Sequence, residues 1–99
     1  MTRIKNLADE IKDELASAKE YAEQSLTYKA KGNDIWANTY HEMAEEELKH
    51  AGYIHDRVIA EIDELRRVYM PPEEMLEKWD ADHKKYIEVA AWIRQMLEM

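Results

Sequence analysis

Apolar residues recur at intervals of three and four positions along most of the chain, the spacing that places them on one face of an α-helix. Two stretches interrupt this pattern, KGND at 31–34 and MPPEE at 70–74, and they contain the strongest helix-breaking residues of the chain. The pattern therefore predicts three helices, at about 3–31, 34–69 and 72–98. We expect an all-α fold.

Each predicted helix has one apolar stripe. The first stripe consists of Ile4, Leu7, Ala8, Ile11, Leu15, Ala18, Ala22 and Leu26. The second consists of Trp36, Tyr40, Met43, Glu47, Ala51, Ile54, Val58, Ile62, Leu65 and Tyr69, and the third of Leu76, Trp79, His83, Tyr86, Ile87, Ala90 and Leu97. The third helix also carries Val89, Trp92, Ile93 and Met96, which widen its apolar arc. We interpret these four residues as a subunit contact; the alternative is a few exposed apolar residues of the kind that monomer surfaces tolerate.

Local signals mark the predicted helix ends. Gly32 fits the C-terminal cap of the first helix, because a positive φ costs least without a Cβ. Asn33 or Asp34 fits the N-cap of the second helix, and Pro71 and Pro72 stop that helix. Because the first loop is short, we expect the first two helices to form an antiparallel hairpin within a single domain at 1–99.

Composition narrows the classes of function. The 99 residues carry a formal net charge of −8, which argues against nucleic acid and anionic membranes as partners and favours the attraction of cations. The absence of cysteine excludes disulfides, zinc–thiolate sites and iron–sulfur clusters. No apolar run is long enough to span a bilayer and the N-terminus lacks the core of a signal peptide, so we expect a cytoplasmic protein.

Glu47 and His50 stand where the second helix should bury its side chains. At 100° per residue, Glu47 falls at the centre of the second stripe and His50 about 60° to one side. Closing the hairpin brings Glu14, on the inner edge of the first stripe, level with both. A buried carboxylate requires a cation or hydrogen-bond donors. We therefore predict a metal site at Glu14, Glu47 and His50; the alternative is a metal-free polar cluster that fixes the packing.

The remaining predictions concern the other histidines and Glu61. His83 lies at the centre of the third stripe with Asp80 one turn earlier, so it is either a core residue or a further ligand. His41 and His55 are predicted to face solvent. Glu61 is expected to pair with Arg57 or to meet the amino terminus.

One stretch of the chain resembles a known family. It runs from Glu14 through Tyr21, Tyr28, Lys31, Gly32, Met43 and Ala44 to Glu47, Leu48, Lys49 and His50. It is similar to the first helical hairpin of rubrerythrin and of the wider ferritin-like di-iron carboxylate superfamily, over about the first two thirds of the chain. The resemblance implies that Glu14 is a terminal iron ligand, that Glu47 bridges two irons and that His50 is a terminal nitrogen ligand. It also implies a supporting role for Tyr21 beside these ligands.

The chain departs from that family in having one hairpin where the family has two. The third helix carries Asp80 and His83 in the place of a second motif, and no fourth helix supplies the missing glutamate. The resemblance therefore implies that two chains pair across a two-fold axis and complete a four-helix bundle, as in encapsulated ferritins. The cysteine-rich domain of rubrerythrin is absent, and no tail that would target the chain to an encapsulin shell is visible.

These arguments lead to one hypothesis with two alternatives. The first is a ferroxidase, which oxidises Fe(II) with oxygen or peroxide at a di-iron site shared by two subunits, for iron storage or detoxification. This hypothesis predicts one iron per chain, and manganese could use the same ligands. It also predicts a homodimer or a higher even-numbered homo-oligomer. The assembly would lie free in the cytoplasm or inside a protein nanocompartment. The alternatives are a metal-free helical oligomerisation or interaction module and a component of a rubrerythrin-like peroxide reductase.

Overall fold

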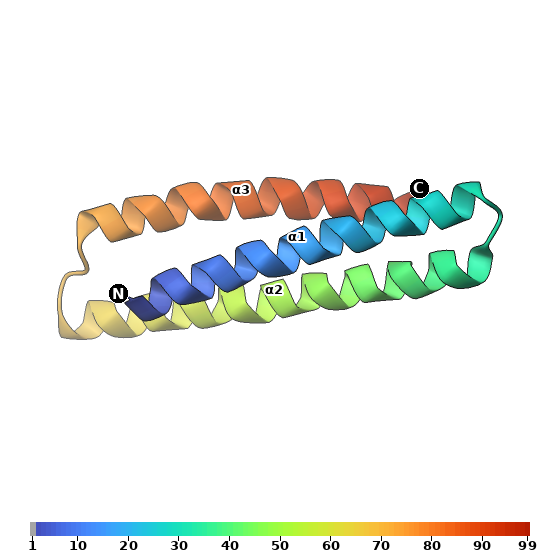
Figure 1. Cartoon of the computed structure of the whole chain (residues 1–99). Coiled ribbons are helices and arrows are strands. Elements are labelled where there is room, and N and C mark those ends of the chain that lie inside the picture. The colour runs from blue at the N-terminus through green and yellow to red at the C-terminus, as the bar shows by residue number, and fades with distance from the viewer. Residues whose placement is uncertain (1) are drawn as a thin grey trace.

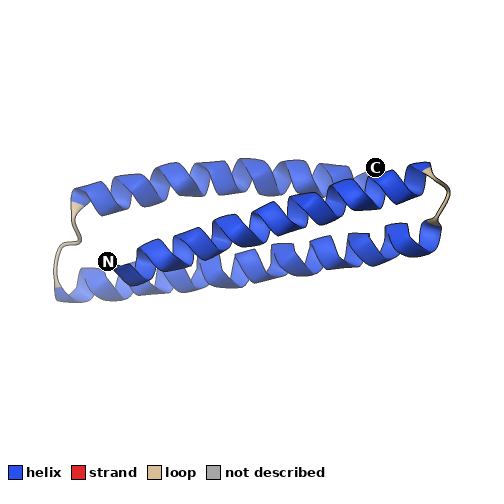
Figure 2. Ribbon diagram, in the orientation of Figure 1, coloured by secondary structure: helices blue, strands red, loops and turns tan. Residues whose placement is uncertain are grey.

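The computed structural model describes residues 2–99, with side chains from Arg3 onward, and it consists of three long helices (Figures 1 and 2). They are α1 (Thr2–Ala30), α2 (Asp34–Val68) and α3 (Glu73–Glu98). The predicted all-α class is confirmed, and each helix end falls within one residue of its predicted position. Met1, the first residue of the predicted domain, lies outside the described residues. In the part of the chain that is described, none of the helices has the length and apolar character required to cross a membrane.

The two connections form where the local signals predict them. Gly32 adopts a φ of 75°, a left-handed conformation that glycine adopts at little cost, and it ends α1. The Asn33 side chain accepts a hydrogen bond from the backbone N–H of Trp36 at 3.2 Å, which makes Asn33 the N-cap of α2. Pro72 directly precedes the first residue of α3 and takes the N-cap position of that helix.

Buried residues at seven-residue intervals form the core faces of α1 and α2. The buried series on α1 are Ile4, Ile11, Ala18 and Ser25, and Ala8, Leu15 and Ala22; the buried series on α2 is Ala37, Ala44, Ala51 and Val58. A seven-residue repeat keeps a seam facing its partner along the whole helix, and alanine side chains allow two helix axes to approach closely. The Ser25 hydroxyl adds a buried hydrogen bond across this seam, donating to the carbonyl oxygen of Ala37 at 2.8 Å.

The third helix packs mainly against α1. It runs parallel to α1 along the hairpin and returns to the loop end (Figure 1). The hydroxyl of Tyr86 donates a hydrogen bond to the carbonyl oxygen of Ala8 at 3.0 Å, and the Trp79 ring is buried in the same core. Burial raises the pKa of Tyr86 to about 12, and the carboxylates of Asp82 and Asp9 contribute to this rise. The phenol therefore stays protonated and keeps donating at neutral pH.

The interpretation of the end of α3 as a subunit contact is wrong for two of its four residues. Ile93 is 0% exposed and Met96 is 7% exposed, because both enter the core of this single chain. Val89 is half-buried against that core, whereas Trp92 is exposed and has the Nζ of Lys19 4.8 Å from its ring centroid. The wide apolar arc of α3 is thus explained largely by its docking on α1.

Burial at Ile93 leads to a prediction about stability. Ile93→Ala should lower the free energy of unfolding by about 2–5 kcal/mol, because the structure cannot fully close the cavity that remains. Ile87 lies on the same helix but is 57% exposed, so Ile87→Ala should change that free energy by less than about 0.5 kcal/mol. Urea unfolding followed by circular dichroism at one fixed protein concentration measures both values. Equal losses in the two variants would contradict the observed docking of α3.

Candidate metal centre

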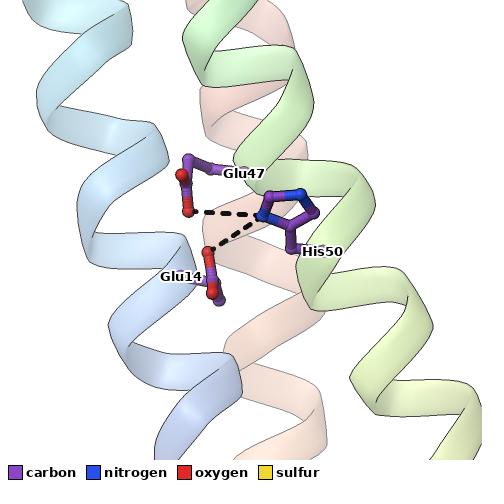
Figure 3. Close-up of side chains that lie close together, drawn as sticks. All are labelled: Glu14, Glu47 and His50. Carbon is purple, nitrogen blue, oxygen red and sulfur yellow. Dashed lines mark ion pairs between the residues drawn. The ribbon is translucent and has the colours of Figure 1, made fainter.

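Glu14 of α1 and Glu47 and His50 of α2 meet at the middle of the hairpin (Figure 3). The Nδ1 atom of His50 lies 3.6 Å from Oε2 of Glu14 and 3.9 Å from Oε2 of Glu47. One ligand atom from each residue can be chosen so that all three lie within 4.8 Å of one another. The structure therefore brings together the three residues that the sequence selected as a candidate site.

The seam between α1 and α2 sets this meeting point. Glu14 directly precedes buried Leu15, and Glu47 lies between buried Ala44 and Ala51. Because the helices are close at these alanines, carboxylates at the edge of the seam reach across to the opposite helix. The level of the site along the hairpin follows from the short loop, which fixes the register of the two helices.

The prediction that Glu47 and His50 point inward needs correction. The side chains of Glu14 and Glu47 are 28% and 23% exposed, and that of His50 is 52% exposed. The reason is that the line of Ala44 and Ala51 occupies the centre of the α2 interface and moves Glu47 to its edge. The α1 residues that contact α3, Ala8 and Lys19, lie about 120–140° around the helix from Glu14, so α3 does not cover the site.

The distances in the cluster exceed those of hydrogen bonds. Both contacts of His50 are longer than the 3.5 Å that a hydrogen bond allows, and in the described chain Glu14 and Glu47 form ion pairs with His50 alone. Ligand atoms about 2.0–2.2 Å from a common ion lie roughly 3–4 Å apart. Small rotations of three partly exposed side chains are enough to reach that spacing. Two carboxylates and one imidazole suit iron, manganese or zinc, and they leave positions open on the ion.

A row of half-buried side chains extends along the hairpin on both sides of the cluster. We call it the open face, and it consists of Leu7, Glu14, Tyr21 and Tyr28 on α1 and of Tyr40, Met43, Glu47, Ile54, Glu61 and Leu65 on α2. The four α1 members follow one another at seven-residue intervals, as do Tyr40, Glu47, Ile54 and Glu61 on α2. Such repeats are typical of a seam that packs against further helices.

Tyr21 lies on this face, about 10 Å along α1 from Glu14. Its ring packs against Tyr40 with centroids 6.1 Å apart, and Tyr40 stacks on Tyr28 at 5.6 Å. Trp36 completes the group at the loop end, where it is 51% exposed. Tyr21 thus belongs to an aromatic cluster whose nearest members lie about two turns from the carboxylates; its predicted support of a metal ligand stays a prediction.

His41 and His55 depart from the sequence-based predictions, whereas His83, expected as a core residue or a further ligand, is half-buried. His55, predicted to face solvent, is half-buried with its Nε2 atom 2.9 Å from Nε2 of His83, and that histidine stacks on Trp79. His41 is also half-buried; its Nε2 contacts the carbonyl oxygen of Leu97 at 3.0 Å. A seven-residue series, His41, Leu48, His55 and Ile62, lies beside the buried alanine line of α2. This repeat is the signal that would have placed His55 toward α3.

Glu61 pairs as predicted. Its Oε1 atom lies 3.0 Å from Nη2 of Arg57 and 3.8 Å from Nη1 of Arg3, near the amino terminus. The two arginines leave this half-buried carboxylate neutralised. Glu61 is therefore a less suitable metal ligand than Glu14 or Glu47.

Comparison with known proteins adds no relatives to this picture. No family model matches the chain, and neither the curated proteins nor the solved structures include a significant match.

The pair of His55 and His83 leads to a prediction about pH. Burial lowers the pKa of His83 below its ordinary value of 6.5, the neighbouring His55 lowers it further, and Asp80 partly opposes both effects. Between pH 6.5 and the folded-state pKa, the unfolded chain binds more protons at this residue, so acidification through that window should destabilise the fold. Above pH 6.5 the unfolded chain no longer takes up this extra proton, so the contribution of a neutral His83 to the free energy of unfolding is fully present.

Urea unfolding of the wild type and of His83→Gln between pH 5 and 8 tests this sign. The stability of the wild type relative to the variant should fall as the pH drops below 6.5 and stay level above it. A difference that grows on acidification would show that the folded state favours the charged imidazole instead.

Proposed function

We propose that this protein binds iron and oxidises Fe(II) at a centre that two copies of the chain share. The observation that carries the proposal is the convergence of Glu14, Glu47 and His50 at separations too long for hydrogen bonds and close to those of metal ligands. The resemblance of the first two helices to the ferritin-like hairpin points to iron among the metals that suit these ligands. Manganese is the metal most similar in its ligand preferences.

Charge and coordination number favour a shared centre. One chain offers three ligand residues, whereas a six-coordinate ion requires more donor atoms. A two-fold axis beside the cluster would place two carboxylates and one imidazole from each chain around two ions. Two Fe(II) ions then balance the charges of the carboxylates from both chains. Without cations, the same pairing would force these carboxylates together, which like charges oppose.

The open face supplies the surface for this pairing. Its members are half-buried in the single chain, with the aromatic cluster on one side of the acids and Leu7, Ile54 and Leu65 on the other. Covering these apolar side chains with a second copy contributes about 25 cal/mol for each Å² removed from water. α3 already docks on the far edge of α1, so both copies keep their third helix in the pair. The result is the ferritin-like four-helix bundle expected from the sequence.

The chemistry assigned to the centre is a two-electron reaction. Two Fe(II) ions each give one electron to O₂, which takes up two protons and leaves as hydrogen peroxide. Carboxylates serve this reaction because oxygen ligands stabilise the ferric product. In the single chain the His50 side chain is 52% exposed, so that iron can reach the ligands before the two copies pair.

Oxidation kinetics test the centre directly. Anaerobic Fe(II) addition followed by oxygen should produce ferric-oxo absorbance, with saturation near one iron per chain. Glu47→Ala and His50→Ala should each lower the initial rate at least tenfold. Replacing even a residue that only orients a metal ligand lowers metal affinity or activity about 10–100-fold. Glu42→Ala is the matched control, since Glu42 is exposed elsewhere on α2. Unchanged rates in both site variants would exclude the site.

Assembly is tested separately by light scattering with and without iron. The wild type with iron should have the mass of a dimer or a higher even-numbered assembly. Ile54→Arg places a charge on the open face and should shift the mass to that of a monomer, whereas Ile35→Arg, at a residue 80% exposed, should not. Circular dichroism confirms that each variant stays helical. A metal-free assembly of normal mass would favour the alternative, an interaction module whose buried seam uses Glu14, Glu47 and His50 as polar contacts.

A further inference from the structure

A second pair of ligand-type side chains lies on the other side of α2. His55 and His83, from α2 and α3, bring their Nε2 atoms to 2.9 Å, with ring centroids 4.7 Å apart and ring planes inclined at 23°. The pair is half-buried, and it lies about 140° around α2 from His50. It is therefore separate from the candidate metal centre on the open face.

The hydrogen bonds of the pair indicate how the protons are arranged when both rings are neutral. Nδ1 of His55 lies 3.1 Å from Oδ1 of Asp56, a contact in which the ring donates its Nδ1–H to the carboxylate. In the neutral ring, Nε2 of His55 then carries a lone pair and accepts the single proton that His83 donates. A carboxylate on the far nitrogen is also the partner that metal-bound histidines use, because it fixes the tautomer and raises the basicity of the ligating nitrogen.

Neutral imidazole is the form that binds metal. When Nε2 of His83 binds a metal ion, its proton would move to Nδ1 of the same ring, so that both rings stay neutral and each offers a lone pair on Nε2. Asp80, one turn before His83, and Asp56 add negative charge that attracts a cation to the pair.

The observed spacing matches that of two ligands bound side by side. Two nitrogens about 2.0–2.1 Å from one ion and at a right angle to each other lie about 2.9 Å apart. The two Nε2 atoms already have this separation, and rotation of the rings about their side-chain bonds would turn both lone pairs from each other toward one ion. Both rings line a cavity of about 220 Å³ between these helices, which leaves room for water on the remaining positions of the ion.

We propose that His55 and His83 form a second metal site, which takes a borderline divalent cation and links α2 to α3. Imidazole suits Cu²⁺, Ni²⁺ and Zn²⁺, and a 2.9 Å separation corresponds to adjacent positions on an ion with right-angle coordination, which Cu²⁺ and Ni²⁺ prefer. This site does not depend on the proposed iron centre. A metal ion at this site would join α2 to α3 at one point only. The two helices also meet elsewhere, for example where Nε2 of His41 contacts the carbonyl oxygen of Leu97.

Copper titration of the full-length chain tests the proposal in a His50→Ala background, which removes the candidate centre on the open face. Electron paramagnetic resonance should show one Cu²⁺ per chain with two nitrogen ligands, and Cu²⁺ should raise the melting temperature. Replacing either His55 or His83 with glutamine in that background should weaken binding at least tenfold, abolish the two-nitrogen signal and remove the rise in melting temperature. Glutamine preserves much of the side-chain volume, and circular dichroism verifies the fold of each variant.

His41→Gln in the same background is the matched control, because it removes a different contact between α2 and α3. It should keep both the two-nitrogen signal and the affinity. A wild-type His55–His83 pair that binds no Cu²⁺, or binding that survives in both glutamine variants, would overturn the proposal and leave a pair that only shares a proton. Loss of iron oxidation in Glu47→Ala with copper binding intact would show that the two sites are independent.

Discussion

The close approach of α1 and α2 along an alanine-rich seam is the constraint on which the rest of the structure depends. Ala18 and Ala22 of α1, with Ala44 and Ala51 of α2, are almost fully buried. Their small side chains let the helix axes come close, and the seven-residue repeat keeps them facing each other for the length of the hairpin. Glutamate side chains at the edge of such a seam reach the opposite helix. Wider separation would leave Glu14 and Glu47 in separate solvent shells.

The position of α3 divides the hairpin into two different sides. On one side, Tyr86 and Trp79 pack over α1, and the histidine pair bridges the remaining gap to α2. On the other side, the open face keeps its acids and aromatic rings half-buried without an intrachain cover. Both sides carry imidazoles, but the surroundings differ: carboxylates surround His50, whereas His83 faces another imidazole and an indole ring. The two proposed sites therefore differ in the ions that would suit them.

Local sequence signals predict the three helices, but they do not predict how α3 packs on the hairpin. Gly32, Asn33 and the two prolines act on the backbone within a few residues, so the helix ends follow from the sequence alone. The meeting of Glu14 with Glu47 follows from the short loop and the helical rise, which are also local. By contrast, an apolar arc as wide as that of α3 allows several docking angles, and the choice among them depends on long-range packing. Ile93, Met96 and His55 were misassigned for this reason.

The sequence pattern places Glu47 deeper in the interface than the structure does, for a related physical reason. A helical wheel averages the apolar positions of a whole helix, and that average falls near Glu47 on α2. Packing instead selects the residues that allow the closest contact, and these are the alanines about 40–60° away. The difference changed the environment of the site from a sealed interior to an edge.

The gradient of exposure within the cluster determines how an ion would exchange. The imidazole of His50 is the outermost group, and the two carboxylates lie deeper between the helices. An ion bound at the proposed centre of the single chain would enter and leave on the side of this exposed imidazole. Rotation about the side-chain bonds of His50 would be sufficient for an ion to enter or leave. The helices themselves can remain rigid, so loading and release would be fast compared with any opening of the hairpin.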